Sequence, residues 1–388
     1  MNTALTLGLA KRMLGLLDRR ETDLAPTIMY EPTEVYTSAE LQQRERDTIF
    51  GRTPMFMGLS ADIPVAGSWR AFEIADTPLL LCRDRAGVAR LHLNSCRHRG
   101  VKIAEGAGRT NSLVCRFHGW RYGLDGTLLG VPEPEGFEEL CREDHGLIEL
   151  PSAEKYGMLF GRPIPGPAID VDELLCGLGP ELGDWGFDSF CLYTEHHLHP
   201  FRGNWKFAWD TFCENYHFAV LHSETLSDYI YSRRQAVDFF GPHVRMVSAL
   251  RSIDALREQP EDEWEPAQHI SIQYRLYPSV SFSVFPEKIE VYWILPGRHP
   301  AEGCGIHAVY VAQQPETDEE RKKLDEAVRF GCENVVNGED LWITGKSEPG
   351  LRAEAAPGHV VFGRNEPVVQ HFHTLYREQT AMTRGDPA

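Results

Sequence analysis

The sequence predicts an α+β protein, in which a small all-β domain precedes a larger domain that combines an antiparallel sheet with helices. Three observations support this class. Between about residues 50 and 165, short apolar segments are interrupted by Gly, Asp and Pro at close intervals, which is typical of hairpins and loops. Further on, Val280, Phe282 and Val284 alternate with serines, as in an antiparallel strand. The 388 residues are too many for one ordinary core and favour two domains.

The N-terminal part is predicted to be helical. Apolar side chains recur at helical spacing at Leu5, Leu9, Met13 and Leu16. This pattern indicates an amphipathic helix packed on the body of the protein. Two basic residues interrupt the apolar run and no small-residue cleavage site follows it, so a secretory signal is not favoured. The stretch Thr37-Ser-Ala-Glu40 has the form of a capping box, which predicts a second helix to about Phe50.

The second half of the chain is predicted to mix helices and strands. The segment 202–222 is expected to be one helix, and residues 269–313 are expected to form antiparallel strands, with "PSVSFSVF" as a half-buried strand. A last helix is predicted to begin near Thr317, whose following acids suit a first turn. It should end by Pro349, because proline disrupts a helix interior.

The composition argues against several classes of function. The formal net charge is −18, from 57 acidic and 39 basic residues, and such a surface repels nucleic acid and anionic lipid. The sequence has no apolar run long enough for a transmembrane segment. Its nine cysteines are an odd number and lack the density of a secreted disulfide scaffold. We therefore expect a cytoplasmic protein without nucleic-acid or membrane partners.

Two Cys/His pairs lie on two predicted hairpin loops, "NSCRHRG" and "LVCRFHGW". They are Cys96 with His98 and Cys115 with His118. Two thiolates and two neutral imidazoles can hold a tetrahedral zinc ion. They can equally hold a two-iron cluster, with the cysteines on one iron and the histidines on the other. Zinc sites usually take two thiolates from one turn, whereas each loop here offers one Cys and one His, which favours the cluster.

The stretch "CRHRG…CRFHGWRYGLDG" resembles the signature of Rieske domains. The resemblance implies a [2Fe–2S] Rieske cluster bound by Cys96, His98, Cys115 and His118. It also implies that His98 and His118 lie on the outer iron, where an electron enters and leaves.

A second group of donors lies in "CENYHFAVLH". On a helix, Asp210, Glu214 and His217 would share one side, because positions three and four apart are neighbours. His222 is five residues beyond His217, about 140° further round an ideal helix. The two histidines can therefore meet one ion only if the helix bulges or ends between them. Two histidines and one carboxylate are the usual ligands of non-haem iron that keeps open positions.

The stretch "GNWKFAWDTFCENYHFAVLH" is similar to the catalytic signature of Rieske non-haem iron oxygenases, the aromatic-ring-hydroxylating dioxygenase alpha-subunit family. The resemblance implies that His217 and His222 bind a mononuclear Fe(II). It implies that Glu214 is not a ligand but a hydrogen-bonded bridge, which passes electrons to His217 from His118 of a neighbouring subunit. Asp210 is expected to support these residues without touching the metal.

Late in the chain, "NGEDLWITGKSEPGL" resembles the C-terminal segment of the same family and points to Asp340 as the third ligand, with Glu333 and Glu339 as near competitors. The sequence departs from the family pattern in two places. The bridging acid is Glu where most members have Asp, and Thr211 stands where Asn is usual. Neither change removes a ligand. Cys213 is expected to be a small packed residue.

The resemblance covers roughly residues 45–375 and implies a division into domains. Residues 1–47 are expected to form a helical segment packed on the catalytic domain. Residues 48–163 are expected to be the Rieske domain, and residues 164–388 the catalytic domain with its mononuclear iron. The catalytic domain should be helix-grip-like, with a curved antiparallel sheet over helices.

The function implied by the resemblance is that of a terminal oxygenase, acting as a monooxygenase or a dioxygenase. The sequence has no convincing dinucleotide fingerprint, so electrons should come from a separate NAD(P)H-dependent reductase, with or without a ferredoxin. With O2, the protein would hydroxylate or oxidatively demethylate a small organic substrate, and the family expectation is a homotrimer. An electron carrier without oxygenase activity, or a zinc-stabilised binding protein, is the alternative of a different class.

The substrate is expected to lie under the antiparallel sheet, beside the iron helix. The aromatic residues of that region are Tyr274, Phe282, Phe285, Tyr292 and Trp293. Most of them should be core, but they make an aromatic substrate the first hypothesis. A quaternary ammonium compound, which aromatic rings can cage, is the second. Arg233-Arg234 could pair a substrate carboxylate, although a solvated pair is the simpler interpretation.

Overall fold

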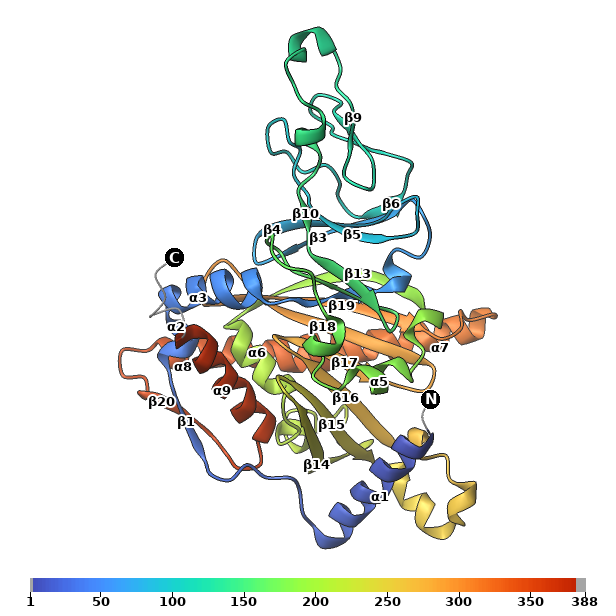
Figure 1. The fold of residues 1–388 in the computed structure, drawn as a ribbon. Coiled ribbons are helices and arrows are strands. Elements are labelled where there is room, and N and C mark those ends of the chain that lie inside the picture. The colour runs from blue at the N-terminus through green and yellow to red at the C-terminus, as the bar shows by residue number, and fades with distance from the viewer. Residues whose placement is uncertain (1–2, 382–388) are drawn as a thin grey trace. The chain divides into compact units, whose positions relative to one another are not determined.

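The computed structural model describes residues 3–381, which form two compact units (Figure 1). One unit contains residues 50–189, and the other contains the chain up to Ile49 and from Phe190 onward. The first is built mainly of short strands and the second of a large sheet with helices, so the predicted α+β class is confirmed. The predicted domain boundary lies earlier than this division, because residues 164–189 belong to the smaller unit.

Three small antiparallel sheets make up most of the smaller unit. Its strands are β2 (Met55–Leu59), β3 (Ser68–Ile74), β4 (Thr77–Arg83), β5 (Ala89–Leu93), β6 (Ala107–Arg109), β7 (Leu113–Val114), β8 (Arg121–Tyr122), β9 (Leu128–Gly130), β10 (Glu149–Leu150), β11 (Ser152–Lys155) and β12 (Met158–Gly161). The strand orders are β10-β5-β4-β3-β6, β11-β12-β2 and β7-β8-β9. Two short helices follow, α4 (Val171–Leu174) and α5 (Gly179–Gly183). A core that includes Leu80, Trp120 and Tyr122 lies next to the two Cys/His loops.

A seven-stranded antiparallel sheet forms the centre of the larger unit. Its strands are β13 (Cys191–Arg202), β14 (Ile230–Phe240), β15 (His243–Leu250), β16 (Ile270–Leu276), β17 (Val280–Val284), β18 (Lys288–Pro296) and β19 (Glu302–Val311). Their order is β13-β19-β18-β17-β16-β15-β14. The antiparallel strands predicted for residues 269–313 are therefore present, each paired with its neighbour in the chain.

Both faces of the β17 strand are covered, whereas the sequence predicts a half-buried strand. Val280 and Phe282 are fully buried, and Ser281 is only 1% exposed. The strand register places Ser281 opposite Arg275 on one side and Tyr292 on the other. The period of two therefore separates an apolar buried face from a polar buried face, rather than core from solvent.

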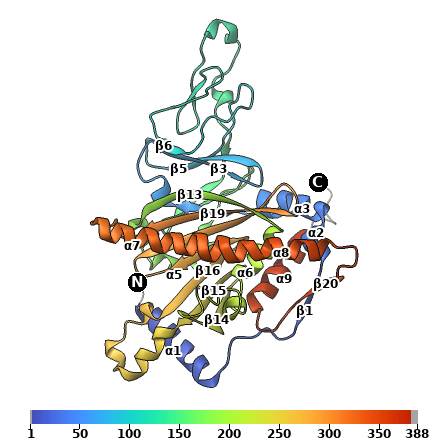
Figure 2. The same cartoon turned by 180° about the vertical axis from the view of Figure 1, so that it is seen from behind.

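Helices surround this sheet in the larger unit (Figures 1 and 2). They are α1 (Thr3–Arg19), α2 (Glu34–Thr37), α3 (Ala39–Glu45), α6 (Trp205–Phe212), α7 (Asp318–Arg329), the π-helix η10 (Phe330–Asp340), α8 (Leu341–Arg352) and α9 (Pro367–Ala381). Figure 2 shows the continuous run α7–η10–α8 crossing the sheet. A small sheet pairs β1 (Met29–Pro32) with β20 (His359–Phe362). Within residues 3–381, no helix is long and apolar enough to span a bilayer.

The N-terminal helices belong to the larger unit. Helix α1 buries Leu9 and Met13 and lies against β14 and β15. The helix predicted to be capped by Thr37 begins one residue later, because Ser38 is the N-cap and its hydroxyl accepts the N–H of Leu41 at 3.2 Å. Helix α3 then passes into a turn of π-helix up to about residue 50.

The segment 202–222 is not one helix, because α6 ends at Phe212. The carboxylate of Glu214 accepts hydrogen bonds from the backbone N–H groups of Tyr216 and His217, the latter at 3.1 Å. These donors are therefore not available to a continuing helix. A local side-chain contact thus overrides the helical periodicity of the sequence.

The last predicted helix does not end at Pro349. Helix α8 continues to Arg352, with Pro349 inside it. The proline stands three residues before the end of the helix, so the donor that it lacks and the clash of its ring disturb only the last turn.

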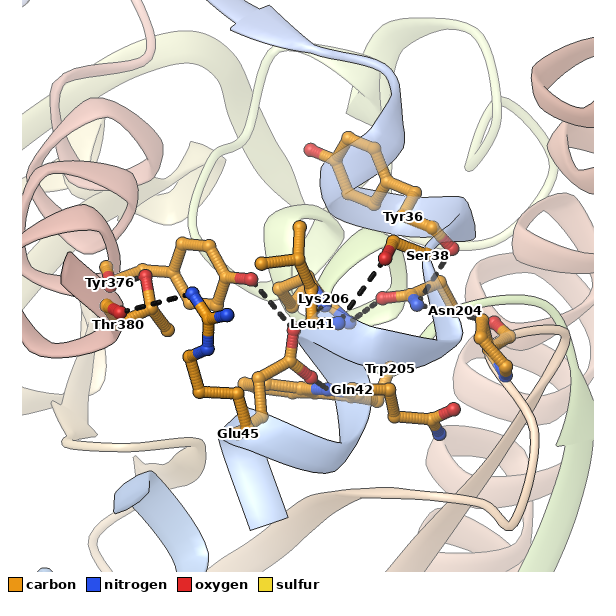
Figure 3. A network of polar contacts seen from close by, with 12 residues as sticks. Tyr36, Ser38, Leu41, Gln42, Glu45, Asn204, Trp205, Lys206, Tyr376 and Thr380 are labelled. Carbon is orange, nitrogen blue, oxygen red and sulfur yellow. Dashed lines mark hydrogen bonds and ion pairs between the residues drawn. The ribbon is translucent and has the colours of Figure 1, made fainter. Parts of the chain in front are cut away.

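A buried polar network ties the N-terminal segment to α6 and α9 (Figure 3). Glu45 of α3 forms an ion pair with Lys206 of α6, and both side chains are fully buried. Glu45 also accepts hydrogen bonds from Trp205 Nε1 at 2.7 Å and from the hydroxyl of Tyr376 at 2.8 Å. Burial lowers the pKa of Lys206, and Glu45 acts in the opposite direction. The network holds the first turn of α6, which leads into the functional site.

Candidate active site

Two loops of the smaller unit have the same backbone arrangement. In each, the N–H of the cysteine, Cys96 or Cys115, donates at 2.8 Å to the carbonyl five residues later. The glycine four residues after each cysteine returns a hydrogen bond to the cysteine carbonyl, at 2.8 Å and 3.0 Å. These glycines, Gly100 and Gly119, have φ angles of +76° and +72°, which residues with a side chain rarely adopt.

The four predicted cluster ligands occupy these two loops. Cys96 and Cys115 are buried, whereas His98 is half-buried and His118 is exposed. The rings of His98 and His118 lie 4.7 Å apart, and Trp120 stacks on His98 at 5.0 Å. Two buried thiols beside two adjacent, accessible imidazoles are the donor set that a mixed-ligand two-iron cluster requires. The residues present therefore fit a [2Fe–2S] group.

One polar side chain beside this donor set was missed by the sequence argument. The hydroxyl of Tyr122 lies 3.3 Å from Sγ of Cys96 and accepts the N–H of Arg97 at 3.1 Å. Hydrogen bonds to ligand sulfurs tune the potential of a cluster. Tyr122 is a buried residue seven positions beyond Cys115, and only its contact with the other loop distinguishes it from an ordinary core residue.

In the larger unit, the three side chains predicted as iron ligands meet. Nε2 of His217 lies 3.1 Å from Nε2 of His222. Oδ1 of Asp340 lies 3.4 Å and 3.2 Å from these two nitrogens. The three atoms can surround one ion. Two imidazoles and one carboxylate suit non-haem iron, so these residues fit the group as well.

The electrostatics of this cluster favour a bound cation. Asp340 is buried, and its Oδ1 has no hydrogen-bond partner within the described part of the chain. Burial acts to raise the pKa of this carboxyl, but His217 and His222 lower it below its ordinary value. Burial acts to lower the pKa of His217, but Asp340 and Glu214 raise it to about 10. The carboxylates thus stabilise positive charge at this point, whether a proton or a metal ion supplies it.

Each histidine is held by a further carboxylate. Oε1 of Glu214 contacts Nδ1 of His217. Oε2 of Glu339 lies 2.6 Å from Nδ1 of His222 and accepts the hydroxyl of Thr225 at 2.7 Å. A carboxylate on Nδ1 fixes the ring and leaves Nε2 free for a metal. Glu339, which the sequence left as a competing ligand, takes this supporting position.

Irregular backbone brings these residues together. After α6 has ended, the N–H groups of Val220 and Leu221 both donate to the carbonyl of His217, at 2.9 Å and 2.8 Å. This tight turn, rather than a bulged helix, brings His222 back to His217. Asp340 is the last residue of the π-helix η10, and π-helical turns are frequent at functional sites.

Two other residues of the iron segment have different surroundings. Asp210 accepts the hydroxyl of Tyr36 at 2.6 Å and lies 3.0 Å from Nε2 of His373, so it links α6 to α2 and α9. Because α6 ends before His217, Asp210 does not share a helical face with that histidine. Cys213 is buried, and burial raises the pKa of its thiol well above the ordinary value.

A cavity of about 620 Å³ lies beside the histidine cluster, and its wall includes His217, His222 and Asp340. This volume is in the range of small-molecule sites. Much of the remaining wall is apolar, and its aromatic rings are those of Phe212, Phe218, Tyr229, Phe285, Tyr292 and Phe330. The cavity can therefore hold a small organic molecule next to a bound ion.

Two of the five aromatic residues predicted near the substrate, Phe285 and Tyr292, line the cavity. Tyr274, Phe282 and Trp293 are instead buried and are not among the lining residues. Strand alternation explains the difference, since the polar positions of β16 and β17 face the cavity and their apolar neighbours face the other side of the sheet.

One polar side chain of the cavity wall is a fully buried arginine. Arg275 donates to the backbone carbonyl of Phe212, to Oγ of Ser281 and to Oε1 of Gln273. Burial lowers the pKa of Arg275 to about 10, so it stays charged at neutral pH. All three acceptors are neutral, and a positive charge therefore remains in the wall. The predicted pair Arg233-Arg234 is not among the lining residues.

A second cation of the wall is already neutralised. Nζ of Lys288 forms an ion pair with Oε1 of Glu290 and lies 5.0 Å from the ring centre of Phe285. One acid and one aromatic ring of the wall that could attract a cationic ligand, Glu290 and Phe285, are thus already in contact with a lysine of the protein.

Two regions of the chain match models of protein families. Residues 53–145 match the Rieske [2Fe-2S] domain, and residues 187–382 match the catalytic domain of ring hydroxylating alpha subunits. The second match begins close to the start of the larger unit rather than at the predicted residue 164.

Curated relatives resemble part of the chain. It is 32% identical to biphenyl 2,3-dioxygenase subunit alpha of Rhodococcus jostii over 216 residues, which is 53% of this chain and 44% of the relative. It is 30% identical to the glycine betaine monooxygenase oxygenase subunit of Chromohalobacter salexigens over 200 residues, 51% of this chain and 44% of the relative. The match thus spans less than half the length of these relatives.

Solved structures share the fold over almost the whole chain. A quaternary ammonium Rieske monooxygenase, described for carnitine oxidation and inter-subunit electron transfer, superposes with a TM-score of 0.77 at 19% identity, covering 92% of this chain and 96% of that chain. Naphthalene 1,2-dioxygenase from a Rhodococcus species superposes with a TM-score of 0.70 at 18% identity, covering 98% and 99%. These two neighbours act on different kinds of substrate, so the fold alone leaves the substrate open.

Proposed function

This chain belongs to the alpha subunits of Rieske non-haem iron oxygenases, and from that premise we propose that it is a terminal oxygenase component. It uses O2, and electrons from a separate NAD(P)H-dependent reductase with or without a ferredoxin, to hydroxylate or oxidatively demethylate a small aromatic compound. The observation that supports this best is the convergence of His217, His222 and Asp340 at the wall of a cavity. An electron carrier would need neither these ligands nor the cavity.

The residues of the chain have separate tasks in this reaction. When bound, the cluster and the mononuclear iron supply one-electron transfer and the activation of O2. His217, His222 and Asp340 hold the iron, and all three line the cavity. Glu214 and Glu339 orient the two imidazoles through Nδ1. The apolar part of the lining keeps water away from the substrate.

Glu214 is proposed to have a second task, the transfer of electrons. Its carboxylate contacts the imidazole of His217 and is nearly buried, with 10% of the side chain exposed. We infer that, in a homotrimer, this carboxylate meets His118 of a neighbouring copy and so connects the cluster of one chain with the iron of another. His118 is exposed in the smaller unit, as this contact requires. A monooxygenase of the same fold is described for inter-subunit electron transfer, which is the kind of route proposed here.

The variant Glu214→Gln should keep both metals but slow the re-oxidation of the reduced cluster about 10–100-fold. Gln keeps the size of the side chain but removes the charge that links the two imidazoles. The measurement is a single turnover, in which the reduced protein with substrate is mixed with O2 and the cluster absorbance is followed.

Glu339→Gln is the matched control for this experiment, because Glu339 contacts the other iron histidine in the same way. Like Glu214→Gln it should keep the iron, but it should not slow the re-oxidation of the cluster. Equal slowing in both variants would show that Glu214 only orients His217. Unchanged re-oxidation kinetics in Glu214→Gln would contradict its proposed role in electron transfer.

Arg275 and Lys288 in the cavity wall favour a neutral aromatic ring over a quaternary ammonium ion, whereas the exposed Glu287 of the same wall acts in the opposite direction. Arg275 leaves a positive charge in the wall, and Lys288 already occupies Glu290 and the face of Phe285. A cationic substrate would be repelled by Arg275, and it would compete with Lys288 for Glu290 and Phe285. The aromatic rings of the wall suit the flat face of an arene.

A ligand panel tests the substrate class on the iron-loaded protein. Neutral arenes and aromatic ethers should raise the unfolding temperature, since a ligand at 100 times its Kd stabilises by about 2.7 kcal/mol. They should also stimulate O2 uptake with a surrogate reductase. Glycine betaine and other quaternary amines are tested in parallel. If only these compounds raise the unfolding temperature and stimulate O2 uptake, the substrate is a quaternary ammonium compound and not an arene.

A further inference from the structure

A second cluster of metal-binding side chains lies in the larger unit and shares no residue with the predicted iron ligands. It consists of His199 on β13, His307 on β19 and Cys332 on η10. One ligand atom of each lies within 4.8 Å of the other two, and Sγ of Cys332 is 3.4 Å from Nε2 of His199. On one tetrahedral zinc ion, a thiolate sulfur and an imidazole nitrogen are about 3.6 Å apart. The closest pair is therefore already at the spacing that a zinc ion would impose.

His307 gives an independent reason to expect a ligand at this place. It is 1% exposed, and its Nε2 has no hydrogen-bond partner among the residues that the structure describes. Its ring stacks on Tyr292 at 4.2 Å, which fixes its orientation. Leaving a buried polar atom unpaired costs about 1–3 kcal/mol. A group that the chain itself does not supply, such as a metal ion, would remove this cost.

His199 is oriented as a metal ligand would be. Its Nδ1 lies 3.0 Å from the side-chain amide nitrogen of Asn337, whose Oδ1 is buried without a partner. Turning that amide by half a rotation lets Oδ1 accept the Nδ1–H of His199, and it moves Nδ2 away from Sγ of Cys332, which it contacts at 3.7 Å before the rotation. The lone pair of Nε2 then faces Cys332, and this is how a ligand histidine is usually held by its other nitrogen.

The π-helix η10 explains how Cys332 and Asn337 both reach His199. They are five residues apart, which matches the i to i+5 hydrogen bonding of a π-helix, so both lie on one face. The same helix ends in Asp340, and η10 thus contributes a side chain to both clusters. Oε2 of Glu290 lies 3.8 Å from Nε2 of His307 and offers an oxygen for a fourth position.

One ligand of this cluster, His199, is reached by a cavity. A cavity of about 540 Å³, separate from the substrate cavity, has His199 and Asn337 in its wall. An entry path and a supported ligand are two of the features that a real metal site should have.

We propose that His199, His307 and Cys332 bind a zinc ion, with Glu290 or a water molecule in the fourth position. One thiolate and two imidazoles suit zinc better than the iron of the neighbouring centre, whose donors are nitrogen and oxygen. The ion ties two strands of the sheet to η10 and so supports the helix that presents Asp340. His199, His307 and Cys332 are not among the residues that line the substrate cavity, whereas Glu290 is.

The test uses the full-length, iron-loaded protein, incubated with micromolar Zn2+ and then freed of unbound metal. Elemental analysis should find about one zinc per chain in addition to the iron, and X-ray absorption at the zinc edge should show one sulfur neighbour at about 2.3 Å. Zinc that replaced iron at His217 and His222 would have no sulfur neighbour, so the two places are distinguished in the wild-type protein.

Variants locate the ion. Cys332→Ser and His307→Gln should each lose the zinc and keep the iron. His197→Gln is the control, because His197 is an exposed histidine on the same strand as His199 and lies opposite His307 in the register. No retained zinc, zinc without a sulfur neighbour, or zinc that is lost in Asp340→Ala but kept in Cys332→Ser would each overturn the proposal. If a variant does not fold, the absorption spectrum of the wild-type protein still decides.

Discussion

Replacing Asp340 with alanine is expected to remove the mononuclear iron and to leave the [2Fe–2S] spectrum unchanged. The Oδ1 atom of Asp340 lies 3.4 Å from Nε2 of His217 and 3.2 Å from Nε2 of His222, and it is buried without another partner in the described part of the chain. Without it, two histidines remain for an ion that needs a charged ligand. Product formation should fall at least about 10³-fold, since a bound metal contributes several kcal/mol to such a step.

Iron analysis, the visible spectrum and product formation together check this prediction. Glu333→Ala is the matched control, because Glu333 is an acid on the same π-helix but is exposed. It should retain iron and activity. Retention of iron in Asp340→Ala, or its loss in Glu333→Ala, would place the third ligand elsewhere.

Replacing Lys206 with methionine is expected to lower the free energy of unfolding of the larger unit by about 3–5 kcal/mol. The change leaves the carboxylate of Glu45 fully buried without its ion-pair partner. The hydrogen bonds from Trp205 and Tyr376 remain, but they do not neutralise the charge. The measurement is the urea midpoint of the larger unit, followed by tryptophan fluorescence and repeated at a second probe wavelength.

The double variant Lys206→Met with Glu45→Gln separates charge from packing. The amide oxygen of glutamine can still accept from Nε1 of Trp205, and the amide NH2 group can donate to the hydroxyl oxygen of Tyr376, so most of the lost stability should return. A double variant as unstable as the single one would mean that packing, and not the unpaired charge, is responsible. Lys323→Met, which removes an exposed ion pair with Glu319, should change the midpoint little.

Much of the candidate site could be proposed from the sequence because its donors lie close together in the chain. Cys96 and His98 lie on one short loop, and Cys115 and His118 lie on another. Once each loop forms, the two donors of that loop are therefore already close to each other. The position of Gly100 follows the same logic, since a tight loop there needs a positive φ.

Helix limits were harder to predict, because side-chain hydrogen bonds compete with periodicity. The spacing in residues 202–222 is compatible with one helix, yet the carboxylate of Glu214 takes the N–H groups of Tyr216 and His217. Nothing in the order of residues says which of these two sets of hydrogen bonds is the more stable. Pro349 shows the opposite error, where a helix breaker is tolerated because it stands in the last turn.

By itself the sequence predicted the α+β class and the two Cys/His loops, because these depend on local spacing and alternation, whereas the pair His217 and His222 was predicted through the resemblance of its stretch to a known signature. Only the tertiary structure decided that Asp340 faces the two iron histidines while Glu339 supports one of them from behind. Adjacent residues on a helix point in different directions, and only packing against distant elements selects the one that faces inward. The same packing turns the polar positions of β16 and β17 toward the cavity.

The cluster of His199, His307 and Cys332 is the clearest case of this limit. Its three residues come from two strands and a π-helix that are far apart in the chain. No two of these residues are close enough in the sequence to form a recognisable metal-binding motif. Their meeting results from the pairing of β13 with β19 and from the place where η10 crosses that pair, which are properties of the folded chain alone.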